Sequence, residues 1–186
     1  MNNYTLIAGV NGTGKSSLRG VLEGQGAPLG HIIDAYAIAK ENNFDNLHAV
    51  KQAVSEIQFC LENNISFTQE TTLSGHRTER TLRQARKQGY YITMYCIGLN
   101  SKEESLLRIA NRVRKGGHDI PKADVIRRFD NRVESLRKTI PLCDKVVFYD
   151  NENGFVKAAE IINNKFNYTN GIRPQWLTEI KEKLSL

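Results

Sequence analysis

An eight-residue segment near the start of the chain, Gly9–Ser16, fits the pattern G-x-x-x-x-G-K-[ST] at every fixed position. The apolar run Tyr4–Ala8 before it predicts a buried strand, and Lys15–Leu22 after it predicts a helix that ends before Gly24. A phosphate-binding loop (Walker A) requires this order of strand, glycine-rich turn and helix. The segment therefore predicts that the chain binds the phosphates of a nucleotide.

The residue types in this loop each have a chemical reason. Glycine lets the backbone turn tightly and aim its N–H groups at phosphate oxygens, and the positive end of the following helix points at the same oxygens. Lys15 is expected to reach the β and γ phosphates, and the hydroxyl of Ser16 is expected to help hold Mg²⁺. The residues expected to contact the nucleotide are Gly9, Asn11, Gly12, Thr13, Gly14, Lys15, Ser16 and Ser17.

Strands and helices alternate along the rest of the chain. Further strands are expected at residues 31–34, 65–68, 90–97 and 145–149, and helices at 46–61, 78–88, from 101, at 122–138 and at 175–184. This alternation predicts an α/β fold: a three-layer P-loop NTPase sandwich around a mostly parallel sheet, forming a single domain over residues 1–186. The tail, about 155–186, is interpreted as an extension that either widens the sheet or binds a partner.

The net charge of +6 is concentrated in one segment, since residues 77–138 contain 16 Lys and Arg against 7 Asp and Glu. This segment favours a polyanionic ligand, either a nucleotide, a sugar nucleotide or a nucleic acid, although solvated helix faces give the same pattern. Only four aromatic residues occur in it, and three of them belong to the strand expected at 90–97. Single-strand binders stack bases on aromatic side chains, so nucleic acid is the less favoured ligand.

The cysteines and the hydropathy pattern exclude several protein classes. Cys60, Cys96 and Cys143 are widely spaced and form no C-x-x-C pair, which favours a reducing compartment over a disulfide framework or a cysteine zinc site. The longest uncharged run, near 90–101, is too short to span a bilayer. The first apolar run, Tyr4–Ala8, leads straight into the glycine-rich loop, so we expect no secretory leader. We therefore expect a cytoplasmic protein without a membrane segment.

Two carboxylates follow predicted strands, Asp34 and Glu70. In an open parallel sheet these positions lie at the same edge as the phosphate loop, where ligands bind. Asp34 could act as a general base or a magnesium ligand, and Glu70 could hold a substrate hydroxyl or support the metal. Helix capping is the alternative for both. Thr71 and Thr72 follow Glu70, so this turn is rich in hydroxyl groups.

A cluster of cations follows in the basic helix pair at about 101–138, where Ser101 begins the first helix with a capping box. Arg108, Arg112 and Lys115 share one face of that helix. The glycine pair at 116–117 allows the two helices to hinge as a lid. Arg128, at the far side of this turn, is a second candidate to close over the phosphates. The alternative is an Arg-rich solvated helix pair.

Several segments together resemble the zeta-toxin family of P-loop kinases, in particular its short stand-alone branch. The specific stretches are E-T-T-L-S-G at 70–75 and N-R-V-x-x-G-G-H-D-I-P at 111–121, besides the phosphate loop and shorter matches up to residue 151. The resemblance implies a fold like that of small-molecule kinases and ATP as the phosphoryl donor. In toxin members the acceptor is the 3′-hydroxyl of the amino sugar of UDP-N-acetylglucosamine.

The resemblance also implies roles for individual residues. It places Glu70 and Thr71 on the substrate side, Arg112 and an arginine beyond the glycine pair near the phosphates, and residues 149–151 near the adenine. Together with the reasoning above, this predicts Lys15, Asp34, Arg112 and Arg128 as catalytic residues and Ser16 as the metal ligand. The predicted substrate-binding residues are Asp34, Glu70, Thr71, Thr72 and His118.

One position departs from the family pattern. The family has an aspartate general base two positions beyond Asp34, and this chain has Tyr36 there. Either Asp34 takes over the role or base assistance is weak, which phosphoryl transfer tolerates because it depends mostly on positioning and charge. The sequence therefore predicts an Mg-ATP-dependent kinase of a sugar nucleotide or a similar small molecule. The alternatives are an ATP-binding regulatory module with little catalysis and a basic nucleic-acid-binding or end-processing protein. A toxin role would imply an antitoxin on a separate chain.

Overall fold

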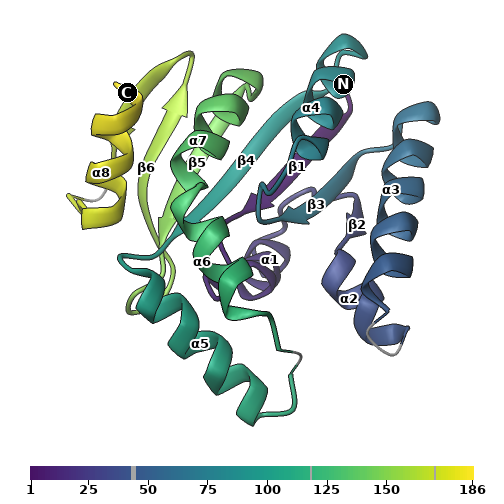
Figure 1. Cartoon of the computed structure of the whole chain (residues 1–186). Coiled ribbons are helices and arrows are strands. Elements are labelled where there is room, and N and C mark those ends of the chain that lie inside the picture. The colour runs from purple at the N-terminus through teal and green to yellow at the C-terminus, as the bar shows by residue number, and fades with distance from the viewer. Residues whose placement is uncertain (43–44, 118, 170) are drawn as a thin grey trace.

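A computed structural model describes residues 1–42, 45–117, 119–169 and 171–186. Its centre is a seven-stranded sheet in the order β2-β3-β1-β4-β5-β6-β7 (Figure 1). The first five strands in this order are parallel and the last two are antiparallel. The strands are β1 (Asn3–Ala8), β2 (His31–Ile33), β3 (Phe67–Thr71), β4 (Tyr91–Gly98), β5 (Lys145–Asp150), β6 (Val156–Ile162) and β7 (Lys165–Tyr168).

Helices cover both faces of this sheet, so the predicted three-layer α/β architecture is confirmed. Figure 1 shows α4 and α7 in front of the sheet and α1 behind it. The helices are α1 (Lys15–Gly24), α2 (Ala35–Glu41), α3 (Asn46–Glu62), α4 (Arg77–Lys87), α5 (Lys102–Arg114), α6 (Lys122–Asp130), α7 (Arg132–Thr139) and α8 (Gln175–Leu184), with a 3-10 turn, Ile140–Leu142, after α7.

The two faces of the sheet are buried to different extents. The larger apolar cluster joins one face to α3, α4, α7 and α8, and includes Phe67, Met94 and Trp176. The smaller cluster joins the other face to α1 and is built on Ile7 and Leu18. β4 was expected to be covered on both faces, but its residues alternate between buried and half-buried because α1 covers its second face only in part.

Two predictions about elements needed correction, and one helix was missed. The helix expected over 122–138 is two helices, α6 and α7, that meet at Asn131. The strand expected to end at residue 68 continues to Thr71, so Glu70 lies within β3 and opposite Ile7 of β1. The short helix α2 was not predicted. The tail, left open between two tasks, widens the sheet through β6 and β7 and then packs α8 onto it.

All three cysteines are free thiols in buried positions. None of the helices in the described ranges is both long and apolar enough to cross a bilayer.

Candidate active site

The phosphate loop lies between β1 and α1, as its sequence predicts. Gly12 and Gly14 have φ of +80° and +92°, a backbone conformation that strongly favours glycine. Lys15 begins α1, and its Nζ donates to the carbonyl oxygens of Gly9 at 2.9 Å and Val10 at 3.2 Å. The lysine ammonium is therefore folded over the loop, at the N-terminal end of the helix.

Two carboxylates, Asp34 after β2 and Glu70 near the end of β3, contact side chains in the first turns of α1. The Ser16 hydroxyl donates to Glu70 Oε2 at 2.9 Å. Arg19 Nη1 donates to Glu70 Oε1 at 2.8 Å and lies 3.3 Å from Asp34 Oδ2. The predicted proximity of Asp34 and Glu70 is therefore observed, with an arginine between them. Sequence analysis missed Arg19, although its position one helical turn beyond Lys15 and Ser16 was a usable signal.

Asp34 also caps α2. Its Oδ1 accepts from the backbone N–H groups of Tyr36 at 2.9 Å and Ala37 at 3.3 Å, and the residue is only 7% exposed. The capping alternative that the sequence left open is thus observed for this residue. Its second oxygen, Oδ2, faces Arg19. One oxygen of the carboxylate is therefore structural, and the other belongs to the charged site.

The charges of the site act on one another. The pKa of Lys15 is lowered to about 8, chiefly by burial and in smaller part by the charges of Arg112 and Arg128, while Glu70 and Asp34 oppose the shift. Burial, followed by the charge of Asp34, raises the pKa of Glu70, against the hydrogen bond from Ser16 and the charges of Arg19 and Lys15. The predicted catalytic residues therefore lie within electrostatic reach of one another.

Two arginines reach this region from the predicted lid. Arg128 of α6 donates to Asn11 Oδ1 of the phosphate loop at 3.1 Å. The guanidinium of Arg112 in α5 lies 5.0 Å from the centre of the Tyr36 ring. A Cβ on Gly117 would lie 2.6 Å from Arg112 Cγ, so the turn after α5 fits closely against this arginine.

The glycine pair of the predicted lid has a structural task in α5. The N–H of Gly117 bonds to the carbonyl of Arg112, and that of Gly116 bonds to the carbonyl of Val113. Gly116 has a φ of +82°, as the left-handed residue of a Schellman cap. The two glycines therefore end the helix, and a hinge at this point stays a prediction.

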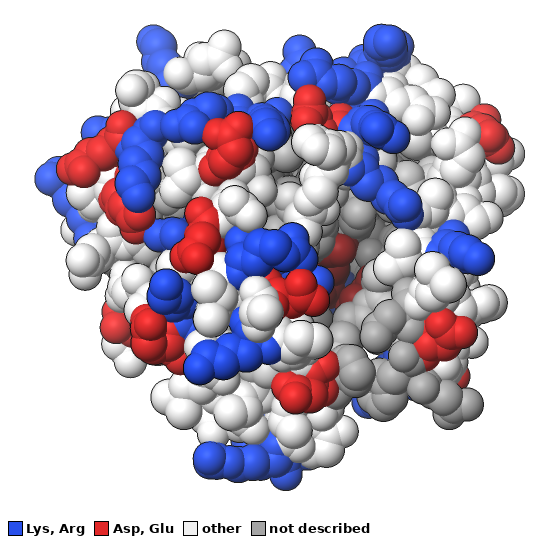
Figure 2. Space-filling model, viewed as in Figure 1, with Lys and Arg blue, Asp and Glu red and all other residues white. Residues whose placement is uncertain are grey.

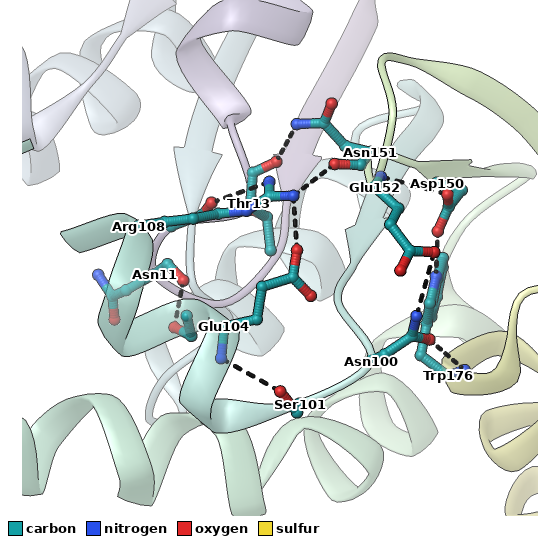
Figure 3. A network of polar contacts seen from close by, with 12 residues as sticks. Asn11, Thr13, Asn100, Ser101, Glu104, Arg108, Asp150, Asn151, Glu152 and Trp176 are labelled. Atoms are coloured by element: carbon teal, nitrogen blue, oxygen red, sulfur yellow. Dashed lines mark hydrogen bonds and ion pairs between the residues drawn. The ribbon is translucent and has the colours of Figure 1, made fainter. Parts of the chain in front are cut away.

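The start of α5 and the turn after β5 hold the phosphate loop from the other side (Figure 3). The Ser105 hydroxyl donates to Asn11 O at 2.6 Å, and Asn151 Nδ2 donates to Thr13 O at 2.9 Å. Arg108 Nη2 contacts Glu104 Oε1 and Asn151 O, both at 2.6 Å. These contacts join α5, the loop and β5 into one network, which sequence spacing could not reveal because its members are far apart in the chain.

Comparison with known proteins decides the family. The model of the family described as Zeta toxin matches residues 34–160 of this chain. The chain belongs to the zeta-toxin family. The matched range begins after the phosphate loop, so the loop is separate evidence for a nucleotide-binding member of this family. The resemblance drawn from the motifs of the sequence is confirmed.

Relatives of this zeta-toxin family member differ in how far they match. An uncharacterized protein of Haemophilus influenzae is 34% identical over 124 residues, which cover 64% of this chain and 86% of that protein. The crystal structure of AvrRxo1-ORF1 with AvrRxo1-ORF2 and ATP has a TM-score of 0.70 at 15% identity, covering all of this chain and 64% of the other. This chain thus spans less than two thirds of its AvrRxo1 counterpart.

A second solved structure belongs to a named toxin–antitoxin system. The PezAT system of Streptococcus pneumoniae matches all of this chain and 86% of the other, with a TM-score of 0.62 at 15% identity. At this identity the likeness is one of fold. Family and fold together support an ATP-dependent phosphotransferase of the zeta-toxin type.

The remaining predicted residues of this zeta-toxin family member occupy varied positions. Thr71 Oγ1 accepts from Leu73 N at 3.0 Å and lies 3.3 Å from Thr78 Oγ1, so it supports the turn after β3. Thr72 is half-buried and pairs with Ser74 at 2.9 Å. Ser17 is exposed on the first turn of α1. His118 lies outside the described residues.

The oxygens at the start of α1 fit Mg²⁺ as it is bound beside nucleotides. Ser16 Oγ and Glu70 Oε2 are hard oxygen donors 2.9 Å apart. In the described ranges no cluster of three or more His, Cys, Asp or Glu forms a complete metal cage.

Proposed function

We propose that this chain transfers the γ-phosphoryl group of ATP to a hydroxyl of a sugar nucleotide, such as UDP-N-acetylglucosamine, or of a related small molecule. The observation that carries the proposal is the pairing of Ser16 with Glu70 within electrostatic reach of Lys15, whose ammonium is folded over the phosphate loop. A phosphoryl donor, its metal and an acceptor carboxylate need this juxtaposition. Family membership supports the reaction class.

The loop residues and the cations act on the donor. The backbone N–H groups of Gly9–Ser16 and the start of α1 would bind the ATP phosphates. Lys15, Arg112 and Arg128 would neutralise charge on the transferred group. Ser16, beside Glu70, would hold Mg²⁺, which would supply charge neutralisation for the phosphates.

The carboxylates act on the acceptor. Oδ1 of Asp34 caps α2, which leaves Oδ2 for the acceptor. Oδ2 would accept the proton of the acceptor hydroxyl while the hydroxyl oxygen forms its bond to the γ-phosphorus. The bond from the γ-phosphorus to the β-phosphate oxygen breaks, and ADP leaves with the electron pair. Glu70, with Thr71 and Thr72 after it, would orient the acceptor, and His118 is proposed as a further acceptor contact.

A second function follows from Tyr36. In the family this position carries an aspartate that acts as general base, and this chain lacks it. The nearby Asp34 is largely engaged by α2 and Arg19. A chain with this arrangement could bind ATP without efficient transfer and act as a regulatory module. For either function we propose a separate antitoxin protein as partner, since PezAT is a toxin–antitoxin system.

The test is a transfer assay. The protein is incubated with Mg-ATP and UDP-N-acetylglucosamine, and the products are analysed by mass spectrometry. Lys15→Ala should abolish the phosphorylated sugar nucleotide, while Lys87→Ala, which removes an exposed lysine of α4, should not change its yield. ATP binding that depends on Lys15, with no product from this or other hydroxyl metabolites, would contradict the kinase and favour the regulatory module.

A further inference from the structure

A basic cleft lies between α2 and the second half of α5. It has a volume of about 520 Å³, and the described residues that line it include four basic side chains and no carboxylate. The basic residues are Lys40, Arg108, Arg112 and Lys115. Figure 2 shows a hollow near the middle of this face, with basic side chains along one wall and acidic side chains inside it. Its size is in the range of sites for small organic ligands.

The charge of the cleft is only partly neutralised by the protein. Lys40 and Lys115 are exposed, and neither forms an ion pair with any residue that the structure describes. Arg108, in contrast, pairs with Glu104 at 2.6 Å and is tied to the phosphate loop. Two lysines therefore face solvent across one concave surface without a counter-charge. A concave surface lined by one sign of charge concentrates ions of the other sign.

The cleft adjoins the active site rather than forming a separate surface. Arg108 Nη1 approaches Gly12 O of the phosphate loop at 3.5 Å, and the charge of Arg112 acts on Lys15. Tyr36 lines the cleft and stands two residues beyond Asp34. An acceptor whose hydroxyl lay at Asp34 could therefore extend into the cleft.

Tyr36 affects the charge of the cleft wall. A carboxylate at position 36 would bring a negative charge against Arg112, whereas the neutral ring of Tyr36 lies 5.0 Å from the guanidinium. The replacement thus leaves the wall of the cleft cationic. The wall of the cleft at position 36 therefore carries no negative charge.

We propose that this cleft binds the phosphate or diphosphate group of the acceptor, with Lys40 and Lys115 as its charge contacts and Tyr36 as a determinant of acceptor choice. The proposal rests on the proposed function for the identity of the acceptor, but the anion site can be measured without phosphoryl transfer. Lysine binds phosphate as a point charge, so two lysines on facing elements suit a flexible diphosphate ester.

The experiment compares two double variants of equal charge. Lys40→Ala/Lys115→Ala removes the cleft lysines, and Lys51→Ala/Lys87→Ala removes two exposed lysines of α3 and α4. The phosphate loop is first saturated with Mg²⁺ and a non-hydrolysable ATP analogue. Uridine diphosphate and inorganic pyrophosphate are then titrated by calorimetry at two salt concentrations.

We expect the cleft variant to bind uridine diphosphate at least tenfold more weakly, with a smaller salt dependence, and the control to bind it within twofold of the parent. Binding of the ATP analogue should change less than twofold in both. Equal affinity for uridine diphosphate in the parent and the cleft variant would overturn the proposal, as would no binding of either probe to the parent.

The outcomes separate this proposal from the proposed function. If the parent phosphorylates UDP-N-acetylglucosamine and the cleft variant has an unchanged KM, the cleft proposal is wrong and the kinase stands. If the parent transfers no phosphoryl group but binds uridine diphosphate, and the cleft variant does not bind it, the anion site stands and the kinase proposal is wrong. A Tyr36→Phe variant should keep the affinity for uridine diphosphate, and a Tyr36→Asp variant should weaken it.

Discussion

Arg19 Nη1 donates to Glu70 Oε1 at 2.8 Å across 51 positions of sequence. The same nitrogen lies 3.3 Å from Asp34 Oδ2, so one guanidinium group stands between two carboxylates that are both largely buried. Burial and, next, the charge of Asp34 raise the pKa of Glu70. Arg19 opposes both influences and is positioned to keep Glu70 ionised beside Ser16.

Replacing Arg19 should move the acidic limb of the pH profile. Burial and Asp34 already raise the pKa of Glu70, and loss of the Arg19 charge raises it further. If transfer needs the ionised carboxylate, activity is lost as pH falls through this pKa, so Arg19→Met should lose activity at a higher pH than the parent does. The rate is measured from pH 5 to pH 9. Arg83→Met, which breaks only an exposed ion pair with Glu79, is the control and should leave the profile in place.

Asp34 has two tasks that two substitutions separate. Asparagine can still cap α2 through its side-chain oxygen, whereas alanine cannot. Asp34→Ala should therefore lower stability by about 1 kcal/mol relative to Asp34→Asn, measured by denaturant unfolding. Both should reduce kcat by roughly 10² or more if Oδ2 accepts the acceptor proton. Unchanged kcat in Asp34→Asn would remove this residue from the chemistry and leave it a capping role.

ATP binding should weaken at alkaline pH because the pKa of Lys15 is lowered to about 8. At pH 7 about nine-tenths of the molecules carry the lysine charge, and at pH 9.5 only a few per cent do. Binding phosphate favours the charged form, so the Kd for ATP should rise roughly tenfold over this interval. Calorimetry at both pH values measures it. Lys15→Arg keeps its charge throughout and should show little of this dependence; an equal loss of affinity in that variant would contradict the role of Lys15.

Gly98 and Trp176 should be coupled in stability. A Cβ on Gly98 would lie 2.1 Å from Trp176 Cδ2, so the indole rests directly on the glycine at the end of β4. The Trp176 Nε1 also donates to Asp150 Oδ1 at 2.8 Å and anchors α8. Gly98→Ala should lower the free energy of unfolding by about 1–3 kcal/mol because the added methyl group overpacks the site, and Trp176→Leu should lower it by several kcal/mol. In the double variant the cost of Gly98→Ala should largely disappear, which a double-mutant cycle of thermal unfolding tests. Simple additivity would show that the cost of Gly98→Ala does not come from its contact with the indole.

Local patterns predicted most of the elements and much of the site. The phosphate loop could be identified because its eight residues are contiguous and its glycines and lysine have a direct chemical reason. The Ser101 cap of α5 was likewise readable, and its hydroxyl accepts from Glu104 N at 3.1 Å. Asp34 and Glu70 were placed at one edge because the carboxyl ends of parallel strands meet there.

Other features of the fold were not predicted because they depend on contacts between residues far apart in the sequence. The break at Asn131 has no strong stop signal, and α7 departs from α6 where it packs against α4 and α8. The helix α2 is seven residues long and depends on its Asp34 cap and on α3, so its short apolar pattern could not be distinguished from a loop.

The amino-acid sequence alone settles the nucleotide loop, the alternation of strands and helices and the membership of a family, since each is carried by residues close together in the chain. The contacts between side chains of the site are decided by the tertiary structure. Arg19 meets Glu70, and Arg128 meets Asn11 across 117 positions, because strand order and helix packing bring them together. Burial in the folded chain then lowers the pKa of Lys15, which no local sequence pattern could show.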